Sequence, residues 1–322
     1  AVEELWAVTD ANGFWQSGKI SGNADEVLLR ADHESYVSED TFYSADVEEL
    51  LGMSYLMMME RGRVIEGFVL DGEGEGIGGA RVIQPGGLGG NREQVSGEDG
   101  EFRFENAVDG DVSLIAVAEG YSVGAADVNV SDANDGVLIE LDEGERISGH
   151  VVDVNGVGVE GAEVIANGWG GYEVQLWSGV TDSSGGFEWD CGGDEAVRFD
   201  IIKDGYMSWR GFEMSGQTDY LITMYRPLQV GGEVYNGVSG ESVDEFVLFS
   251  GSVDEDGEIE WDLEGRRFRG GKYFVSFSEP AAGHVLRVES EGYEESRSRV
   301  FEDDEGQAVY DFELFREGEL EK

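Results

Sequence analysis

Short acidic turns hold the residues of this sequence best suited to bind a metal ion. They place Asp, Asn or Glu oxygens close together beside a glycine, at residues 10–13, 132–136, 254–257 and 302–306. Calcium prefers such hard oxygen ligands, so it is the one cofactor that the turns could hold. None of them matches the calcium loop that ends in Glu, and Asp-Gly turns also form for backbone reasons alone. The calcium candidates are Asp10, Asn12, Asp132, Asn134, Asp135, Asp254 and Asp256.

Two aromatic rings on a glycine-rich stretch offer a second kind of site. Trp169 and Tyr172 flank Gly170 and Gly171. Stacking on a pyranose face needs a flat platform, so this pair is the carbohydrate-binding candidate. A tryptophan in a β-sandwich is more often part of the core, and that alternative stays open.

A basic cluster is the first candidate contact surface. Arg266, Arg267 and Arg269 form the only dense cationic group in a strongly acidic sequence. They are either a solvated loop or a socket for an acidic surface of a neighbouring module.

An apolar run is the second candidate contact surface. Every residue from Tyr55 to Met59 is apolar, whereas a strand with one wet face would alternate. We therefore expect a strand that is covered on both faces, with Met57 and Met59 among the residues in a contact between modules or subunits.

The charge of the chain excludes two classes of partner. Its 322 residues contain 70 Asp and Glu against 21 Lys and Arg, which gives a net charge of −49. Nucleic acid and anionic membrane surfaces both attract cations, so neither is an expected partner. The charge is spread along the chain, and the scarcity of lysine beside dense carboxylates resembles proteins from high-salt settings, where screening makes such a surface tolerable.

Composition favours a folded all-β chain. Hydrophobic residues make up 40% of the sequence and aromatic residues 11%, enough to fill cores. Asp-Gly and Asn-Gly clusters separate short alternating runs, such as those around Phe102, Phe187 and Tyr273, as in a sandwich of antiparallel strands. One short helical turn is expected, from Asp46 to Leu51.

A repeat organises these runs. Tyr121, Tyr206 and Tyr293 each follow an acidic residue and a glycine, and Tyr36 follows Glu-Ser. The four tyrosines are separated by 85, 85 and 87 residues, which indicates tandem units. Each unit is predicted to end in a strand, at residues 54–59, 137–141, 220–224 and 309–315.

Further sequence motifs recur at the same spacing, and their order resembles that of a known family. The segments GRVIEGFVLD from Gly62, ERISGHVVDV from Glu145 and PLQVGGEVYN from Pro227 share one pattern, and a Gly-Ala pair follows in the first two. With the acidic turn and the Gly-Tyr pair, the order resembles the carboxypeptidase regulatory-like domain. The usual proline before Gly-Ala is absent here, and the pair itself is lost in the last copy. The resemblance implies transthyretin-like or Ig-like sandwiches, similar to collagen-adhesin B-type modules, with about seven strands in two sheets.

The repeat frame divides the chain into modules. Residues 61–143 and 144–226 are predicted to be complete modules, and residues 227–316 a divergent one. Residues 1–60 match only the later part of a module, because its opening strands are missing. Residues 317–322 are either the start of a further module or a tail. The predicted architecture is thus a linear array of small antiparallel β-sandwiches.

Two interpretations of the incomplete first module stay open. The chain is a fragment of a longer array, or a neighbouring chain supplies the missing strands to an open sheet edge. The expected partners are accordingly neighbouring modules of a longer chain or copies of this chain, with glycans as a further candidate.

The family resemblance invites a search for zinc-peptidase residues. Such an enzyme needs a His and a Glu on one short element and a distant second His. No Glu stands three residues after His33, His150 or His284. Cys191 is the only cysteine, and acidic neighbours discourage its use as a nucleophile. The chain is therefore predicted to be non-enzymatic, with no catalytic and no cofactor-binding residues.

The expected role is structural. Modules of fixed length and like charge suit spacing and display, as in a fibre, stalk or filament outside the cell or on its surface. The alternatives are an adhesin or carbohydrate-binding array, and accessory domains of a larger secreted enzyme or receptor. Ala1 opens without a signal peptide, so in a secreted parent that segment would be removed or lie outside this sequence.

Overall fold

The regular secondary structure of the described residues is almost entirely β-strand, which confirms the predicted all-β class. Its only α-helix among the described residues is α1 (Val47–Leu51), where the sequence predicts a helical turn, and η2 (Asp303–Glu305) is a 3₁₀ turn. None of the described helices is long and apolar enough to cross a membrane. The computed structural model describes residues 5–18, 26–31, 33, 35–37, 43–52, 55–86, 91–130, 136–216, 218–254 and 256–316.

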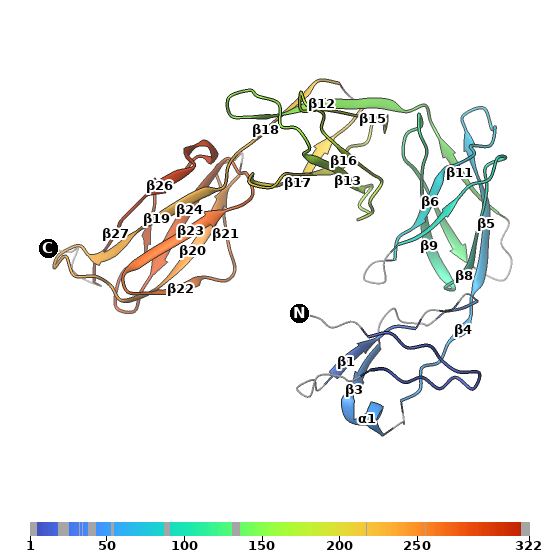
Figure 1. Cartoon of the computed structure of the whole chain (residues 1–322), viewed down its shortest axis with the longest axis horizontal. Helices are drawn as coiled ribbons and strands as arrows, with labels where there is room; N and C mark the ends of the chain where they lie inside the picture. The colour runs from blue at the N-terminus through green and yellow to red at the C-terminus, as the bar shows by residue number, and fades with distance from the viewer. Residues whose placement is uncertain are drawn as a thin grey trace. The chain divides into compact units, whose positions relative to one another are not determined.

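The chain divides into two compact units. The first contains Ala1–Ala116 and Gly124–Leu141, and the second contains Val117–Val123 and Asp142–Lys322. Figure 1 shows the strands of both units, coloured from blue at the N-terminus to red at the C-terminus.

The described residues of the N-terminal part form four short strands. β1 pairs with β3 and β2 pairs with β4, both antiparallel. Residues 55–59 are not in a strand, so the strand predicted at 54–59 is wrong. Exposure alternates along this segment because only one side of it packs on the chain: Leu56 is 79% and Met58 75% exposed. The strands are β1 (Glu26–Leu29), β2 (Tyr36–Val37), β3 (Tyr43–Asp46) and β4 (Glu60–Arg61).

Residues 63–141 form a sandwich of seven strands, as the family resemblance implies. One sheet has the order β11-β5-β8 and the other β10-β9-β6-β7. Inward-facing side chains of alternating strands fill the space between the sheets, with Ile65, Phe104 and Leu114 fully buried. The strands are β5 (Arg63–Asp71), β6 (Arg81–Gln84), β7 (Arg92–Val95), β8 (Glu101–Ala107), β9 (Gly110–Val117), β10 (Gly124–Val130) and β11 (Val137–Leu141).

Residues 145–224 repeat this architecture with the same strand orders, β15-β12-β18 and β14-β13-β16-β17. Its core includes Ile147, Phe199 and the half-buried Trp177, which stacks on Trp189 at a ring-centroid distance of 6.0 Å. The strands are β12 (Glu145–Asp153), β13 (Glu163–Trp169), β14 (Trp177–Val180), β15 (Gly186–Gly192), β16 (Val197–Ile202), β17 (Trp209–Met214) and β18 (Tyr220–Met224).

Residues 228–314 form a divergent sandwich. β19 lies between β23 and the successive strands β26 and β27, and β20 pairs with β21, β22 and β24, with β25 beyond β24. The strand predicted at 309–315 is interrupted at Tyr310 and Asp311, because the Asp311 carboxylate accepts the Glu233 N–H at 2.8 Å in place of a backbone carbonyl. The strands are β19 (Leu228–Asn236), β20 (Glu245–Val253), β21 (Ile259–Trp261), β22 (Arg266–Arg269), β23 (Lys272–Phe277), β24 (Gly283–Glu289), β25 (Ser296–Arg297), β26 (Gln307–Val309) and β27 (Phe312–Leu314).

One glycine lets the first and last strands of each sandwich approach closely. β5 pairs in parallel with β11, β12 with β18, and β19 with β26 and β27. A Cβ on Gly149 would lie 2.5 Å from the carbonyl oxygen of Tyr220, the first residue of β18. Gly67 faces the Val137 carbonyl in the same way, and Gly232 faces that of Tyr310. The glycine shared by the recurring segments that begin at Gly62, Glu145 and Pro227 is thus a packing requirement.

Candidate functional site

The predicted carbohydrate pair lies at the tip of a tight hairpin. The Trp169 N–H donates to the Tyr172 carbonyl at 3.1 Å, and the Tyr172 N–H donates to the Trp169 carbonyl at 2.8 Å. Gly170 and Gly171 have φ of +57° and +84°, as a type I′ turn requires. Both aromatic side chains are half-buried. The turn accounts for the glycine-rich stretch, and carbohydrate binding stays a prediction.

The described calcium candidates lie in backbone turns. The Asp10 carboxylate accepts the N–H of Asn12 at 2.8 Å, and the Asp254 carboxylate accepts the N–H of Glu258 at 2.8 Å. Asp256 is exposed in the second of these turns. No three His, Cys, Asp or Glu side chains are grouped around a possible metal position in the described part of the chain. Calcium binding stays a prediction, and three further candidates lie outside the described residues: Asp132, Asn134 and Asp135.

The same turn recurs in the complete sandwiches. The carboxylate of Asp153 accepts the N–H of Val157 at 2.9 Å, and that of Asp182 accepts the N–H of Gly186 at 2.8 Å. Hydrogen bonds to the ionised carboxylates lower the pKa of both carboxyls below its ordinary value, chiefly the Ser184 hydroxyl for Asp182 and the Val157 N–H for Asp153. Part of the acidity of the chain therefore serves hairpin formation.

The predicted basic contact surface is an exposed strand. Arg266, Arg267 and Arg269 lie on β22, whose Phe268 turns inward and stacks on Phe246. Arg269 forms an ion pair with Glu245 at 3.1 Å. Among the described residues, no carboxylate lies within ion-pair distance of Arg266 or Arg267. Their role as a socket for an acidic surface stays a prediction.

The second predicted contact surface is the apolar run at residues 55–59, and its exposed side chains are not the two that were expected. Met57 and Met59 are half-buried, and Leu56 and Met58 are the exposed residues of this run. A contact there would meet the side chains of Leu56 and Met58 first.

The nucleophile and histidine candidates are held in structural contacts. Burial, with a smaller contribution from the charge of Asp190, raises the pKa of the Cys191 thiol to about 11, and Sγ contacts the Ala118 carbonyl at 3.1 Å. His284 is buried with its Nε2 2.7 Å from Oδ1 of Asp303.

The feature that the described parts share is a repeated junction, whose function the sequence patterns did not reveal. It joins a tyrosine loop to the segment by which the chain leaves that part, here called the exit segment. The tyrosine loops are residues 35–37, 120–122, 205–207 and 292–294, and the exit segments are residues 60–62, 142–144, 225–227 and 315–316.

The same backbone hydrogen bonds hold these junctions together. The residue after the tyrosine donates its N–H to the exit segment in the last three, at 3.0, 2.7 and 2.9 Å. These donors and acceptors are Ser122 to Asp142, Met207 to Tyr225, and Glu294 to Phe315. In the first junction Tyr36 and Val37 pair with Arg61 and Glu60 as β2 and β4.

A second hydrogen bond joins the exit segment to the residue before the tyrosine in the first two junctions. The Gly62 N–H donates to the Ser35 carbonyl at 3.0 Å, and the Gly144 N–H donates to the Gly120 carbonyl at 2.8 Å. Pro227 occupies this position in the third junction and has no N–H. The Arg226 guanidinium donates to the Gly205 carbonyl at 3.3 Å instead, while it lies 4.5 Å from the Tyr206 ring centroid. The contact is thus kept although its chemistry changes.

The third tyrosine loop also contacts the sandwich that follows it in the sequence. Met207 is fully buried in the core of the 228–314 sandwich, and the Ser208 N–H donates to the Ser278 carbonyl at 2.8 Å. The Ala118 carbonyl, just before the second loop, accepts from Cys191 of β15. The third tyrosine loop therefore connects the 145–224 and 228–314 sandwiches through a backbone hydrogen bond and a buried side chain.

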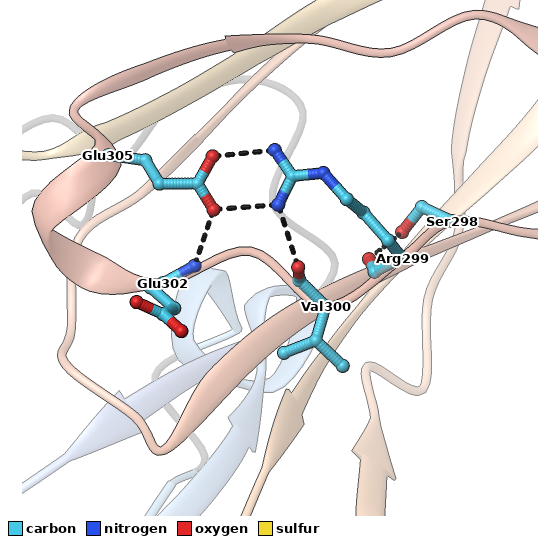
Figure 2. Close-up of polar contacts among 5 residues, drawn as sticks. All are labelled: Ser298, Arg299, Val300, Glu302 and Glu305. Carbon is cyan, nitrogen blue, oxygen red and sulfur yellow. Dashed lines mark hydrogen bonds and ion pairs between the residues drawn. The ribbon is translucent and has the colours of Figure 1, made fainter.

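An ion pair fixes the turn that leads into β26. Figure 2 shows the Arg299 guanidinium bidentate on Glu305, at 2.7 and 2.6 Å. Glu305 also accepts the Glu302 N–H at 2.9 Å, and Arg299 donates to the Val300 carbonyl at 2.8 Å. These contacts lower the pKa of Glu305 to about 2, chiefly through the hydrogen bonds from Arg299.

The Arg299→Gln variant should raise the pKa of Glu305 towards its ordinary value of 4.5. Because the folded-state pKa is depressed, the pair stabilises the fold fully above pH 4.5, and this contribution is lost as the pH falls through about 2. Carboxyl-detected NMR titration of Glu305 measures the shift. Arg297→Gln is the control, since Arg297 pairs with Glu295. An unchanged midpoint in Arg299→Gln would show that Arg299 does not set this pKa.

No family model matches the chain. No curated protein matches it either. The resemblance to the carboxypeptidase regulatory-like family therefore stays a prediction.

Several solved structures share features with the chain at low similarity. The Bacillus anthracis TIE protein is 13% identical, with 98% of this chain and 67% of that one covered and a TM-score of 0.23. A streptococcal ancillary pilin is 9% identical over 79% of this chain and 99% of the pilin, with a TM-score of 0.29. BcpA, the major pilin subunit of Bacillus cereus, is 9% identical over 80% of this chain and all of that one (100%), with a TM-score of 0.22. Such TM-scores are too low to support an inference, so the all-β fold rests on the strands of the chain itself.

Proposed function

We propose that the chain is a non-enzymatic structural segment of an extracellular or cell-surface fibre or stalk. Its modules are carboxypeptidase regulatory-like sandwiches at residues 61–143, 144–226 and 227–316, preceded by a partial module. Its partners are further modules of the same kind, in one chain or in copies of it.

The observation that carries this proposal is the repeated junction. The tyrosine loop is bonded to the exit segment in every described part of the chain, although the residues that make the bonds differ. Such a contact holds the segment by which the chain leaves one sandwich against a loop of that sandwich. A protein that spaces or displays other groups needs a constant geometry at each passage.

The distribution of charge supports the same role. The net charge is −11 for residues 1–60, −13 for 61–143, −9 for 144–226 and −16 for 227–322, which sums to −49. Like charge on every part opposes collapse of one module onto another. The exposed Arg266 and Arg267 are exceptions that would favour contact with an acidic module.

Immunogold electron microscopy tests the proposal on the native material. Antibodies raised against the 322-residue chain should label fibres or stalks that project from the producing cells. Pre-immune serum is the control. Label confined to the cell interior, or to unassembled secreted protein, would overturn the structural role. Binding of the purified chain to a glycan array, lost in Trp169→Ala, would favour the carbohydrate-binding alternative.

A further inference from the structure

The first and last strands of each sandwich meet in the geometry best suited to resist tension. β5 and β11 are parallel over five residue pairs, from Gly67 opposite Val137 to Asp71 opposite Leu141. β12 and β18 are parallel over five equivalent pairs, from Gly149 opposite Tyr220 onward. β19 is parallel to β26 over three pairs and to β27 over three more.

In a parallel pair, the chain enters one strand and leaves the other at opposite ends. Tension on the two chain ends therefore slides the strands past each other and loads all the hydrogen bonds between them together. At an antiparallel terminal pair, the same tension would pull on one end of the ladder and break the bonds one after another. We propose that the parallel terminal strands of each of the three sandwiches form a tension clamp, so that each sandwich bears pulling force along the chain. The inference rests on the proposed fibre or stalk function, which would place the chain under such force.

The core-facing side of the clamp strands is shielded from water by buried side chains. Val137, Ile139 and Leu141 of β11 point into the core and are buried, as are Ile222 and Met224 of β18. Water that competes for the hydrogen bonds of a loaded strand pair has no access from this face. The glycine at the start of each clamp allows the two backbones to approach without a side chain between them.

The third clamp compensates for its interruption with side chains. The Gln307 amide donates to the Gln229 side-chain oxygen at 3.0 Å, and the Tyr235 hydroxyl donates to Glu313 at 2.8 Å. Asp311 receives the Glu233 N–H where the backbone ladder is broken. The two short strands are thus tied to β19 along its length.

The N-terminal part provides an internal comparison. Its described strand pairs, β1 with β3 and β2 with β4, are both antiparallel. It should therefore give way before the clamped sandwiches when the whole chain is pulled.

Optical-tweezer pulling along two directions tests the clamp in the intact 322-residue chain. Glu60→Cys with Glu140→Cys attaches the handles at opposite ends of the β5–β11 pair, and Glu73→Cys with Glu140→Cys attaches both at the same end. All three positions are exposed. Cys191 stays in place because it is only 4% exposed, so labelling of the native chain should spare it. The two variants share one handle position, and matching thermal melts verify that both are folded.

The rupture force should be at least about twofold higher for the first variant than for the second at one loading rate, because only the first loads the hydrogen bonds together. The correct event is recognised by a released length of about 28 nm for the first and about 23 nm for the second, at ~3.5 Å per residue. Equal forces in both directions would overturn the clamp. This outcome is distinct from failure of the proposed function, because the clamp is measured in the purified chain and the fibre on the cell.

Discussion

Replacing Gly149 by alanine should lower the free energy of unfolding of the 145–224 sandwich by about 3 kcal/mol, and valine should cost more. The new Cβ would lie 2.5 Å from the Tyr220 carbonyl oxygen and 3.1 Å from the Phe187 ring. The first contact is with backbone, which cannot turn aside as a flexible side chain can. The sandwich must therefore move β18 away from β12 and lose part of the parallel pairing.

Urea unfolding followed by tryptophan fluorescence measures this effect, because four of the seven tryptophans lie in this sandwich: Trp169, Trp177, Trp189 and Trp209. Hydrogen exchange of peptides that cover β12 and β18 should show the loss locally. Gly67→Ala should act in the same way on the 63–141 sandwich, where the Phe102 ring lies 2.6 Å from the new Cβ.

Gly72→Ala is the matched control for Gly67→Ala, and both are followed by hydrogen exchange because the 63–141 sandwich contains no tryptophan. Gly72 is exposed, and a Cβ on it would have no heavy atom within 4 Å, so its effect should stay within about 0.5 kcal/mol. If Gly67→Ala were as mild as Gly72→Ala, the close approach of the terminal strands would not be a requirement of the fold.

The fold class could be predicted because strand alternation is a local property. The predicted strands at 137–141 and 220–224 match β11 and β18 residue for residue, since each alternates between inward apolar and outward polar or exposed positions. The run at 55–59 failed because it is apolar throughout. Composition alone could not tell whether a second layer would cover its outer face, and in the described chain none does.

The junction was harder to predict. Its tyrosines were visible as repeat markers, and the glycines before them have positive φ in the last three loops, which explains the Gly-Tyr pair. The partner residues lie 25, 22, 20 and 23 positions after the tyrosines, so no fixed spacing connects them. The bonds are also made by backbone, which leaves no residue type as a signal. Where proline removes one donor, an arginine replaces it, and sequence comparison would read that exchange as divergence.

The role of the residue after the tyrosine could not be predicted from the sequence either. Val37, Ser122, Met207 and Glu294 occupy this position, and they share no property. Only the structure shows that Met207 leaves its own sandwich and fills the core of the next one, beside Leu228 and Val230.

Met207→Ala should therefore destabilise the 228–314 sandwich, although the residue lies between β16 and β17. The side chain is fully buried, and its loss leaves a cavity that costs about 3 kcal/mol. Hydrogen exchange should rise in β19 and β24, and the melts of the two sandwiches should separate because a buried contact between them is gone. Met207→Leu is the matched control, since it keeps the volume and should cost less than about 1.5 kcal/mol.

The location of the loss decides what the junction does. If exchange rises only in the strands of residues 145–224, Met207 serves its own sandwich and the tyrosine loop is an ordinary turn. If it rises in residues 228–314, one sandwich supplies part of the core of another. Stability is then shared along the chain through nearest neighbours, as in other repeat proteins. Tension that opens one clamp would in that case weaken the sandwich next to it, so the junctions set how far a local failure spreads.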